Sequence, residues 1–239
     1  MKQMVPTVRF GLVFVLLAAR QTFGGTDIGP KIALHVTATT TKSTSICSTW
    51  SSDVATVPCS GYLVQGDLRQ DLLVYLVIAQ ADTPSFAGGV AGITVGIEYD
   101  GRRGHGVDVT AWTVCADGLD IPNAGPGGEW PASGGGAIIT WLNCQESRVG
   151  GDGYHALVGA FSVYAYSADR LRITPNRNLQ GGPQITLANC FAEEFGVADT
   201  TLALGSAGFG TSGFNPCHPL PVEPTTWGRL KTKYGSGSP

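Results

Sequence analysis

The feature that most constrains the fold is a series of short apolar or alternating runs, separated by clusters of Gly, Pro, Asn and Asp. Runs of this kind, repeated along a chain, are typical of a β-sandwich or β-barrel. The run LLVYLVIAQ is almost continuously apolar, which indicates a central strand buried on both faces. The pattern predicts an all-β domain of about eight or nine strands. The clearest strands are expected at residues 31–39, 72–80, 91–99, 107–114, 137–142, 156–166, 171–174 and 184–190.

The first residues predict export from the cell. Lys2 and Arg9 precede the uncharged apolar run Phe10–Ala19. A basic start followed by such a run is typical of a secretory signal peptide, and the run is shorter than the ~20 apolar residues that span a bilayer. The alternative, a buried first strand or helix of the domain, lacks an amphipathic pattern to complete it. We expect a protein that is secreted or at the cell surface, with a signal peptide at residues 1–24, a domain at 25–217 and a tail at 218–239.

All six cysteines lie in the part of the chain that is expected to be exported. An even number of cysteines in an oxidising compartment predicts disulfides. The alternative, a zinc site, is disfavoured because the chain lacks the usual close Cys and His spacings. The sequence leaves the pairing open. We favour sequential pairing, because it would clip Gly-, Ser- or Pro-rich segments between strands: Cys47–Cys59, Cys115–Cys144 and Cys190–Cys217.

The charge balance argues against nucleic acid as the main partner. Without residues 1–24 the chain has 12 basic and 18 acidic side chains, a formal charge of −6. Binding to a phosphate backbone needs a basic face, which this balance does not favour. No later apolar run is long enough to span a membrane. The expected partners are therefore extracellular proteins or glycans.

Two motifs resemble a known group of secreted domains. The strand at residues 91–99 leads into Glu98-Tyr99-Asp100, and Gly151-Asp152-Gly153 leads into the strand ALVGAFSV. Over residues 91–174 they resemble cohesin-like and carbohydrate-binding-module-like β-sandwiches of secreted bacterial proteins. The resemblance implies an antiparallel sandwich of jelly-roll type that binds protein or glycan. Three disulfides and the lack of a dockerin repeat depart from the cohesin pattern. The segment TTWGRLKTKY is also similar to the ends of uncharacterised secreted bacterial proteins, and that similarity implies no activity.

The search for catalytic residues favours a non-catalytic domain. The chain has no G-x-S-x-G nucleophile motif. The adjacent acids Glu193 and Glu194 would point to opposite faces of an extended segment, which is unsuitable for a glycosidase pair. The four histidines lie in different segments without ligand-like spacing: His35, expected to be a half-buried strand residue, His105, expected in an exposed loop, His155 and His218.

Three acids in Gly-rich loops, Asp117, Asp120 and Asp152, could bind calcium. The simpler interpretation is that they are ordinary turn residues, so no cofactor is expected. Among the aromatic residues, Trp112 and Trp141 lie in strand patterns and are expected in the core. Trp130 lies between a Gly-rich segment and Pro131 and is the aromatic residue most expected to be exposed. Trp130 and Tyr154 are the candidate ligand contacts, for example to a sugar.

The tail contains a basic and aromatic cluster: Trp227, Arg229, Lys231, Lys233 and Tyr234. This cluster could be an anchoring or sorting signal, and the alternative is a disordered end. The sequence as a whole predicts a secreted or surface non-catalytic module with a role in protein binding or adhesion. The alternatives are a carbohydrate-binding accessory module and a secreted hydrolase with an unrecognised site. Coplanar exposed aromatic rings on one sheet face would favour glycan binding. A deep pocket that holds two carboxylates, or His with Asp, would favour an enzyme, and a flat apolar sheet face would favour a protein partner.

Overall fold

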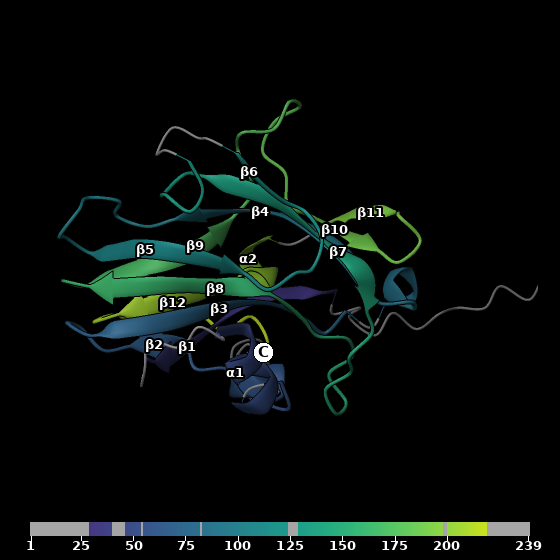
Figure 1. Ribbon diagram of the computed structural model, residues 1–239, viewed down its shortest axis with the longest axis horizontal. Coiled ribbons are helices and arrows are strands. Elements are labelled where there is room, and N and C mark those ends of the chain that lie inside the picture. Colours follow the sequence, from purple (N-terminus) through teal and green to yellow (C-terminus); the bar gives the residue numbers. More distant parts are fainter. Residues whose placement is uncertain are drawn as a thin grey trace, which may run out of the picture.

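The structure, a computed structural model, describes residues 29–39, 46–53, 55–81, 83–123, 129–197 and 200–218. The expected signal peptide lies outside these residues, and so do all the tail residues proposed as an anchor. The described chain is mostly β, and its strands form two sheets that pack against each other (Figure 1). The predicted all-β sandwich is therefore confirmed.

The smaller sheet has four strands in the order β1-β3-β8-β5, and all three pairings are antiparallel. In the central strand β3, every residue after the first is buried, as the apolar run LLVYLVIAQ predicted. The strands of this sheet are β1 (Lys31–Ala38), β3 (Asp71–Ala79), β5 (Val107–Val114) and β8 (Ala156–Ala165).

The larger sheet has eight strands arranged around β4. One edge of β4 pairs with β7, which in turn pairs with β6, and the other edge pairs first with β10 and then with β9. β11 pairs with the outer edge of β10, and β12 pairs with the outer edge of β9 and is followed by β2. Its strands are β2 (Gln65–Gly66), β4 (Val90–Glu98), β6 (Asp120–Asn123), β7 (Gly136–Gln145), β9 (Asp169–Thr174), β10 (Thr186–Asn189), β11 (Glu194–Gly196) and β12 (Ser206–Phe209).

The main core lies between the two sheets. Alternate residues of each strand point into it, as the period of two in the sequence requires. Ile93, Val95 and Ile97 of β4 face Val74 and Leu76 of β3 across this core. Phe161 is fully buried there, in contact with the rings of Trp112 and Trp130.

A second layer of apolar residues covers the other face of the four-stranded sheet, and we call it the outer core. Helix α1 (Ile46–Asp53) lies against this face, as Figure 1 shows. Its Trp50 packs on Tyr75 of β3, with the ring centroids 5.1 Å apart. The outer core explains why β3 is buried on both sides. Its buried members are Ala33, Trp50, Cys59, Tyr62, Leu73, Tyr75, Val77, Ala79, Ala160 and Cys217.

Three short elements complete the described chain. The single-turn helices η1 (Cys59–Gly61) and η2 (Pro84–Phe86) follow α1 and β3, and helix α2 (Thr200–Ala203) precedes β12. No helix in the described part of the chain has the length and apolar character needed to cross a membrane.

All six cysteines form disulfides, but the sequential pairing is wrong. The bonds are Cys47–Cys115, Cys59–Cys217 and Cys144–Cys190. The reason is topological, because a sandwich brings strands that are distant in sequence side by side. For example, β7 and β10 lie on opposite edges of β4, so the bond between Cys144 and Cys190 crosses the start of β4.

Because Gly89 lies where this disulfide crosses the chain, it has no room for a side chain. Gly89 has φ +98°, and a Cβ there would lie 2.5 Å from the Gln145 carbonyl oxygen and 3.2 Å from Cys190 Sγ. We expect Gly89→Ala to lower the free energy of unfolding by at least about 1 kcal/mol, measured by urea denaturation. Gly196→Ala is the control, because nothing lies within 4 Å of a Cβ there. Equal stability of the two variants would contradict the prediction.

Candidate functional site

The outer side of the eight-stranded sheet is the candidate binding surface. Its outward residues follow from the register, because Ile121 pairs with Ile138, and Thr94 pairs with both Ile138 and Thr186. Side chains on these positions share one face of the sheet. We call this surface the open face: Leu119, Ile121, Ile138, Thr140, Leu142, Gly92, Thr94, Thr186 and Ala188.

The open face is flat in its middle and apolar at its margin. Gly92 and Thr94 are buried between their neighbours and Ala188 is half-buried, and because all three residues are small, no large side chain rises from the centre. At the margin, Leu142 is 79% exposed and Leu119 is 61% exposed. Phe191, which is 70% exposed, follows Cys190 and therefore sits beside the disulfide to β7. Several large exposed apolar residues around one sheet face are typical of a protein contact surface.

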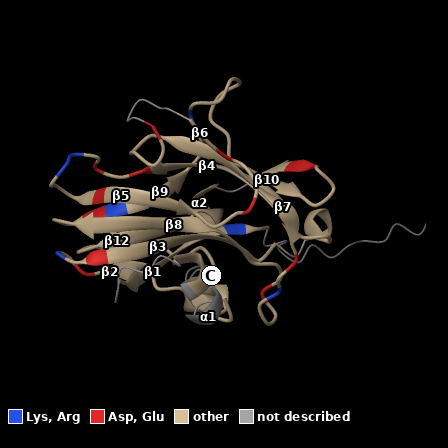
Figure 2. Ribbon diagram, viewed as in Figure 1, with Lys and Arg blue, Asp and Glu red and all other residues tan. Residues whose placement is uncertain are grey.

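Charges lie around this face more than on it. Figure 2 shows acidic and basic residues mostly in loops and at strand ends, and β7 and β10 carry none. Asp117 accepts hydrogen bonds from the Leu142 N–H and the Asn143 amide, at 2.8 and 3.0 Å. The hydrogen bond from the Asn143 side chain, and to a smaller extent the one from the Leu142 N–H, lower the pKa of Asp117. Asp117 therefore stays ionised beside Leu142. Glu194 of β11 pairs with Ala188 and shares its outward face. The rim is therefore acidic on two sides.

The two aromatic residues expected to contact a ligand are buried. Trp130 is 6% exposed and Tyr154 is 7% exposed, and both belong to the main core. Trp130 packs edge-on against Trp112, and the Tyr154 hydroxyl donates to the Ala87 carbonyl at 2.7 Å. The expectation that Trp130 is exposed is wrong, and Tyr154 does not reach the surface either, because tertiary packing covers the segments that carry them. Trp141 is in the core as predicted, and Trp112 is partly buried against it.

The three acids that could have bound calcium each have a separate structural contact. Asp117 bonds to the β7 backbone, Asp120 accepts the Trp112 indole N–H at 3.0 Å, and Asp152 accepts the Cys59 N–H at 2.6 Å. Burial raises the pKa of Asp120. Within the described ranges, no three His, Cys, Asp or Glu side chains are grouped so that they could hold a metal ion.

The histidines are dispersed along the chain, as expected, but two of them, His35 and His155, are buried against aromatic rings of the outer core. His35 is more deeply buried than predicted, at 6% exposed, and its Nδ1 accepts the Leu63 N–H at 3.1 Å. His105 is exposed in its loop and lies 2.6 Å from Asp100 Oδ2. His218 is exposed.

His155 takes part in a buried polar chain. Its Nδ1 lies 3.0 Å from the Tyr62 hydroxyl, and its Nε2 lies 4.0 Å from Asp152 Oδ2. Burial raises the pKa of Tyr62 and lowers the pKa of His155, and the nearby Asp152 partly opposes the latter shift. The phenol is thus neutral and can donate to the imidazole. Among the described residues, none of these three lines the cavity of about 760 Å³ or the cavity of about 370 Å³. Their contacts hold the Cys59 segment against the sheet.

The comparisons with known proteins identify no family for this chain. No family model matches it, and no curated protein matches it. Among solved structures, it is similar to the cohesin module of a family 33 glycoside hydrolase from Clostridium perfringens ATCC13124. The identity is 8%, the TM-score is 0.41, and the match covers 75% of this chain and 95% of that one. A likeness of this size carries no argument about function, which has to come from the side chains.

The open face was not predicted from the sequence, because its strand β6 does not have the composition of a strand. Pro122 breaks the usual composition of a strand, so residues 120–123 carried no strand signal. The alternation of Ile138, Thr140 and Leu142 did mark the outward side of β7. The pairing that places Ile121 beside Ile138 could not be read from either segment alone.

Proposed function

We propose that the chain is a secreted or cell-surface non-catalytic module that binds a protein partner through the open face. The observation that carries this proposal is the flat centre of that face with large exposed apolar side chains around it. Apolar residues that cluster on an exposed sheet face gain most by burial against another protein. Three disulfides support a location outside the cytoplasm.

The aromatic residues favour protein over glycan as the partner. Trp50, Trp130 and Trp141 are buried, and Trp112 is partly buried. The exposed Tyr166 packs against Tyr164 with the ring planes tilted by 56°, so the two rings do not form a coplanar platform. The acidic rim at Asp117 and Glu194 favours a partner with an apolar centre and a basic margin.

The proposal is tested by photo-crosslinking on the full chain in its native host. A benzoylphenylalanine at position 142 or 121 should crosslink to the same protein, while the probe at position 166 should not. Tyr166 is a matched control, because it is 43% exposed, like Ile121 at 44%, and lies at the end of the other sheet. Equal yields at all three positions would contradict the proposal.

Substitutions on the open face should then weaken binding to the crosslinked protein. We expect the double variant Ile121→Ser and Leu142→Ser to bind it at least about tenfold more weakly, because buried apolar anchors dominate such interfaces. Tyr166→Ser should bind as the unmodified protein does. A glycan array supplies the competing outcome: binding of a sugar that is unaffected by the double variant would favour the carbohydrate-binding alternative.

A further inference from the structure

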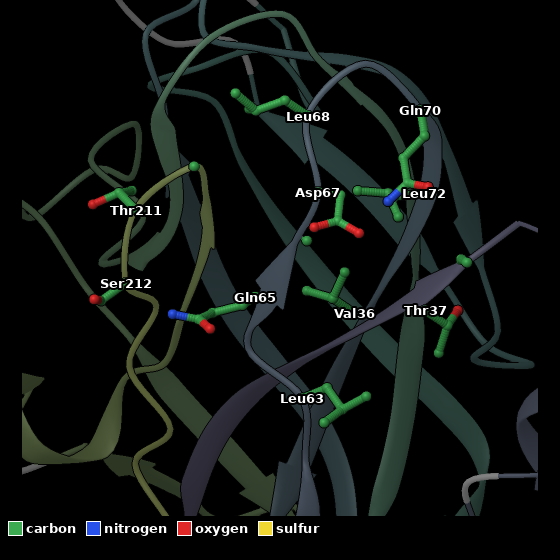
Figure 3. A pocket seen from close by; sticks show the side chains of 13 residues that line it. Val36, Thr37, Leu63, Gln65, Asp67, Leu68, Gln70, Leu72, Thr211 and Ser212 are labelled. Atoms are coloured by element: carbon green, nitrogen blue, oxygen red, sulfur yellow. The ribbon is translucent and has the colours of Figure 1, made fainter.

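A groove of about 760 Å³ lies where the edges of the two sheets separate, between β1 and β2 (Figure 3). It shares no residue with the open face. Val36 and Leu72 are buried side chains at its base, and Gln65, Thr211 and Ser212 lie along its walls. Its volume is within the range of about 300 to 1,000 Å³ that is usual for ligand sites.

Among the residues that the structure describes, backbone groups of β1 face this groove without a strand partner. The Val36 N–H donates to the Leu63 carbonyl at 2.7 Å, which places the even-numbered residues of β1 on the side away from β3. The bond from the Thr39 N–H to the Asp71 carbonyl agrees with this alternation. The Val36 carbonyl and both backbone groups of Ala38 therefore point toward the groove.

The backbone of β2 contributes a second edge, which has no strand partner in the described part of the chain. The Gly208 N–H donates to the Val64 carbonyl at 2.9 Å, so the even-numbered residues of this segment bond to β12. Both backbone groups of Gln65 consequently point the other way, toward β1. Among the described residues, Val36–Leu63 is the last backbone hydrogen bond between the two segments, and β1 and β2 diverge after it.

The side chains around the groove specify its chemistry. Leu63 is 61% exposed and Leu68 is 39% exposed, so the margin offers apolar contact. Of the described residues that line the groove, Asp67 is the one that carries a charge, and Figure 3 shows its carboxylate among the other lining side chains. No aromatic ring is among those lining residues, so the groove lacks a surface on which a sugar could stack.

We propose that this groove binds an extended segment of another protein as an added strand. Two unpaired strand edges are suited to a polypeptide because each offers alternating donors and acceptors at the repeat of a β-strand. The bound segment carries small or β-branched residues toward Val36 and Leu72 and a Lys or Arg toward Asp67. This is a second site, and it does not depend on the function proposed for the open face.

The test uses the full chain and a synthetic acetylated peptide of about seven residues, a usual strand length. The peptide alternates Val and Thr and has one central Lys. Its matched control has the same side chains with N-methylated amides, which cannot donate ladder hydrogen bonds. We expect the control to bind at least about tenfold more weakly, since it loses two or more backbone bonds. Binding of the parent peptide should slow amide exchange at Ala38 and Gln65.

The charge preference is tested separately. Asp67→Asn should weaken binding of the Lys peptide by up to about fivefold, as expected for an exposed ion pair, and leave a peptide with Thr in place of Lys unaffected. Glu146→Gln, which changes an exposed acid outside the groove, should bind as the unmodified chain does. Equal binding of the N-methylated peptide, protection confined to other amides, or no binding at about 1 mM peptide would overturn the proposal.

Discussion

Removing the disulfide between Cys59 and Cys217 should destabilise the protein more than removing either of the other two disulfides. The bond joins residues separated by 158 positions, which is the longest of the three separations. In the chain-entropy model, a cross-link of this length stabilises the folded state by about 5 kcal/mol. We expect the variant Cys59→Ala with Cys217→Ala to lose about this much free energy of unfolding in urea denaturation.

The two other disulfides provide the comparison. They close segments of 68 and 46 residues, so their removal should cost slightly less, about 4 kcal/mol each. Peptide mapping without reduction should recover fragments that join Cys59 to Cys217. Fragments with another pairing, or a double variant within about 1 kcal/mol of the unmodified protein, would contradict the prediction.

The second large effect is a loss of stability in mild acid. Burial lowers the pKa of His35 from 6.5 to about 4, and its Nδ1 can accept the Leu63 N–H only while it is unprotonated. Between these two pH values the unfolded chain binds a proton at His35 and the folded chain does not. The free energy of unfolding therefore falls as the pH falls from about 6.5 to about 4, by roughly 3 kcal/mol for His35. His155 adds a loss in the same direction, because burial lowers its pKa too.

The variant His35→Gln isolates this effect. Gln cannot titrate, and its amide oxygen can accept the Leu63 N–H. The variant should lose most of the pH dependence between pH 6.5 and 4, whatever its stability at neutral pH, when urea denaturation is repeated across that range. His105→Gln is the control, because His105 is exposed and leaves His35 and His155 untouched. An unchanged slope in His35→Gln would show that His35 is not responsible.

The sequence was sufficient to predict most of the strands and insufficient to predict how they are arranged. Every expected strand is present, because alternation and Gly-rich boundaries are local signals. The strands that were missed have two to four residues, and the partner strand defines them more than their own composition does. Helix α1 was missed for a related reason. Its sequence ICSTWSSD has no apolar stripe, and Trp50 and the disulfide of Cys47 hold it against the sheet.

The candidate sites were harder to predict than the fold. Trp130 was expected to be exposed because of its Gly- and Pro-rich surroundings, but Trp112 and Phe161 pack around it. Neither the open face nor the groove has a sequence motif. The first depends on the register of β6, β7, β4 and β10, and the second on the point at which β1 and β2 separate. Such surfaces are properties of strand pairing, which one sequence does not encode locally.

The outer core also determines how the module can be presented. Cys217 belongs to the outer core, on the side of the four-stranded sheet that faces away from the main core. The open face lies on the opposite side of the sandwich (Figure 1). Whatever is joined to the chain after His218 is therefore attached at the back of the module. A tether fixed there would leave the open face directed outward, accessible to a partner approaching from the other side.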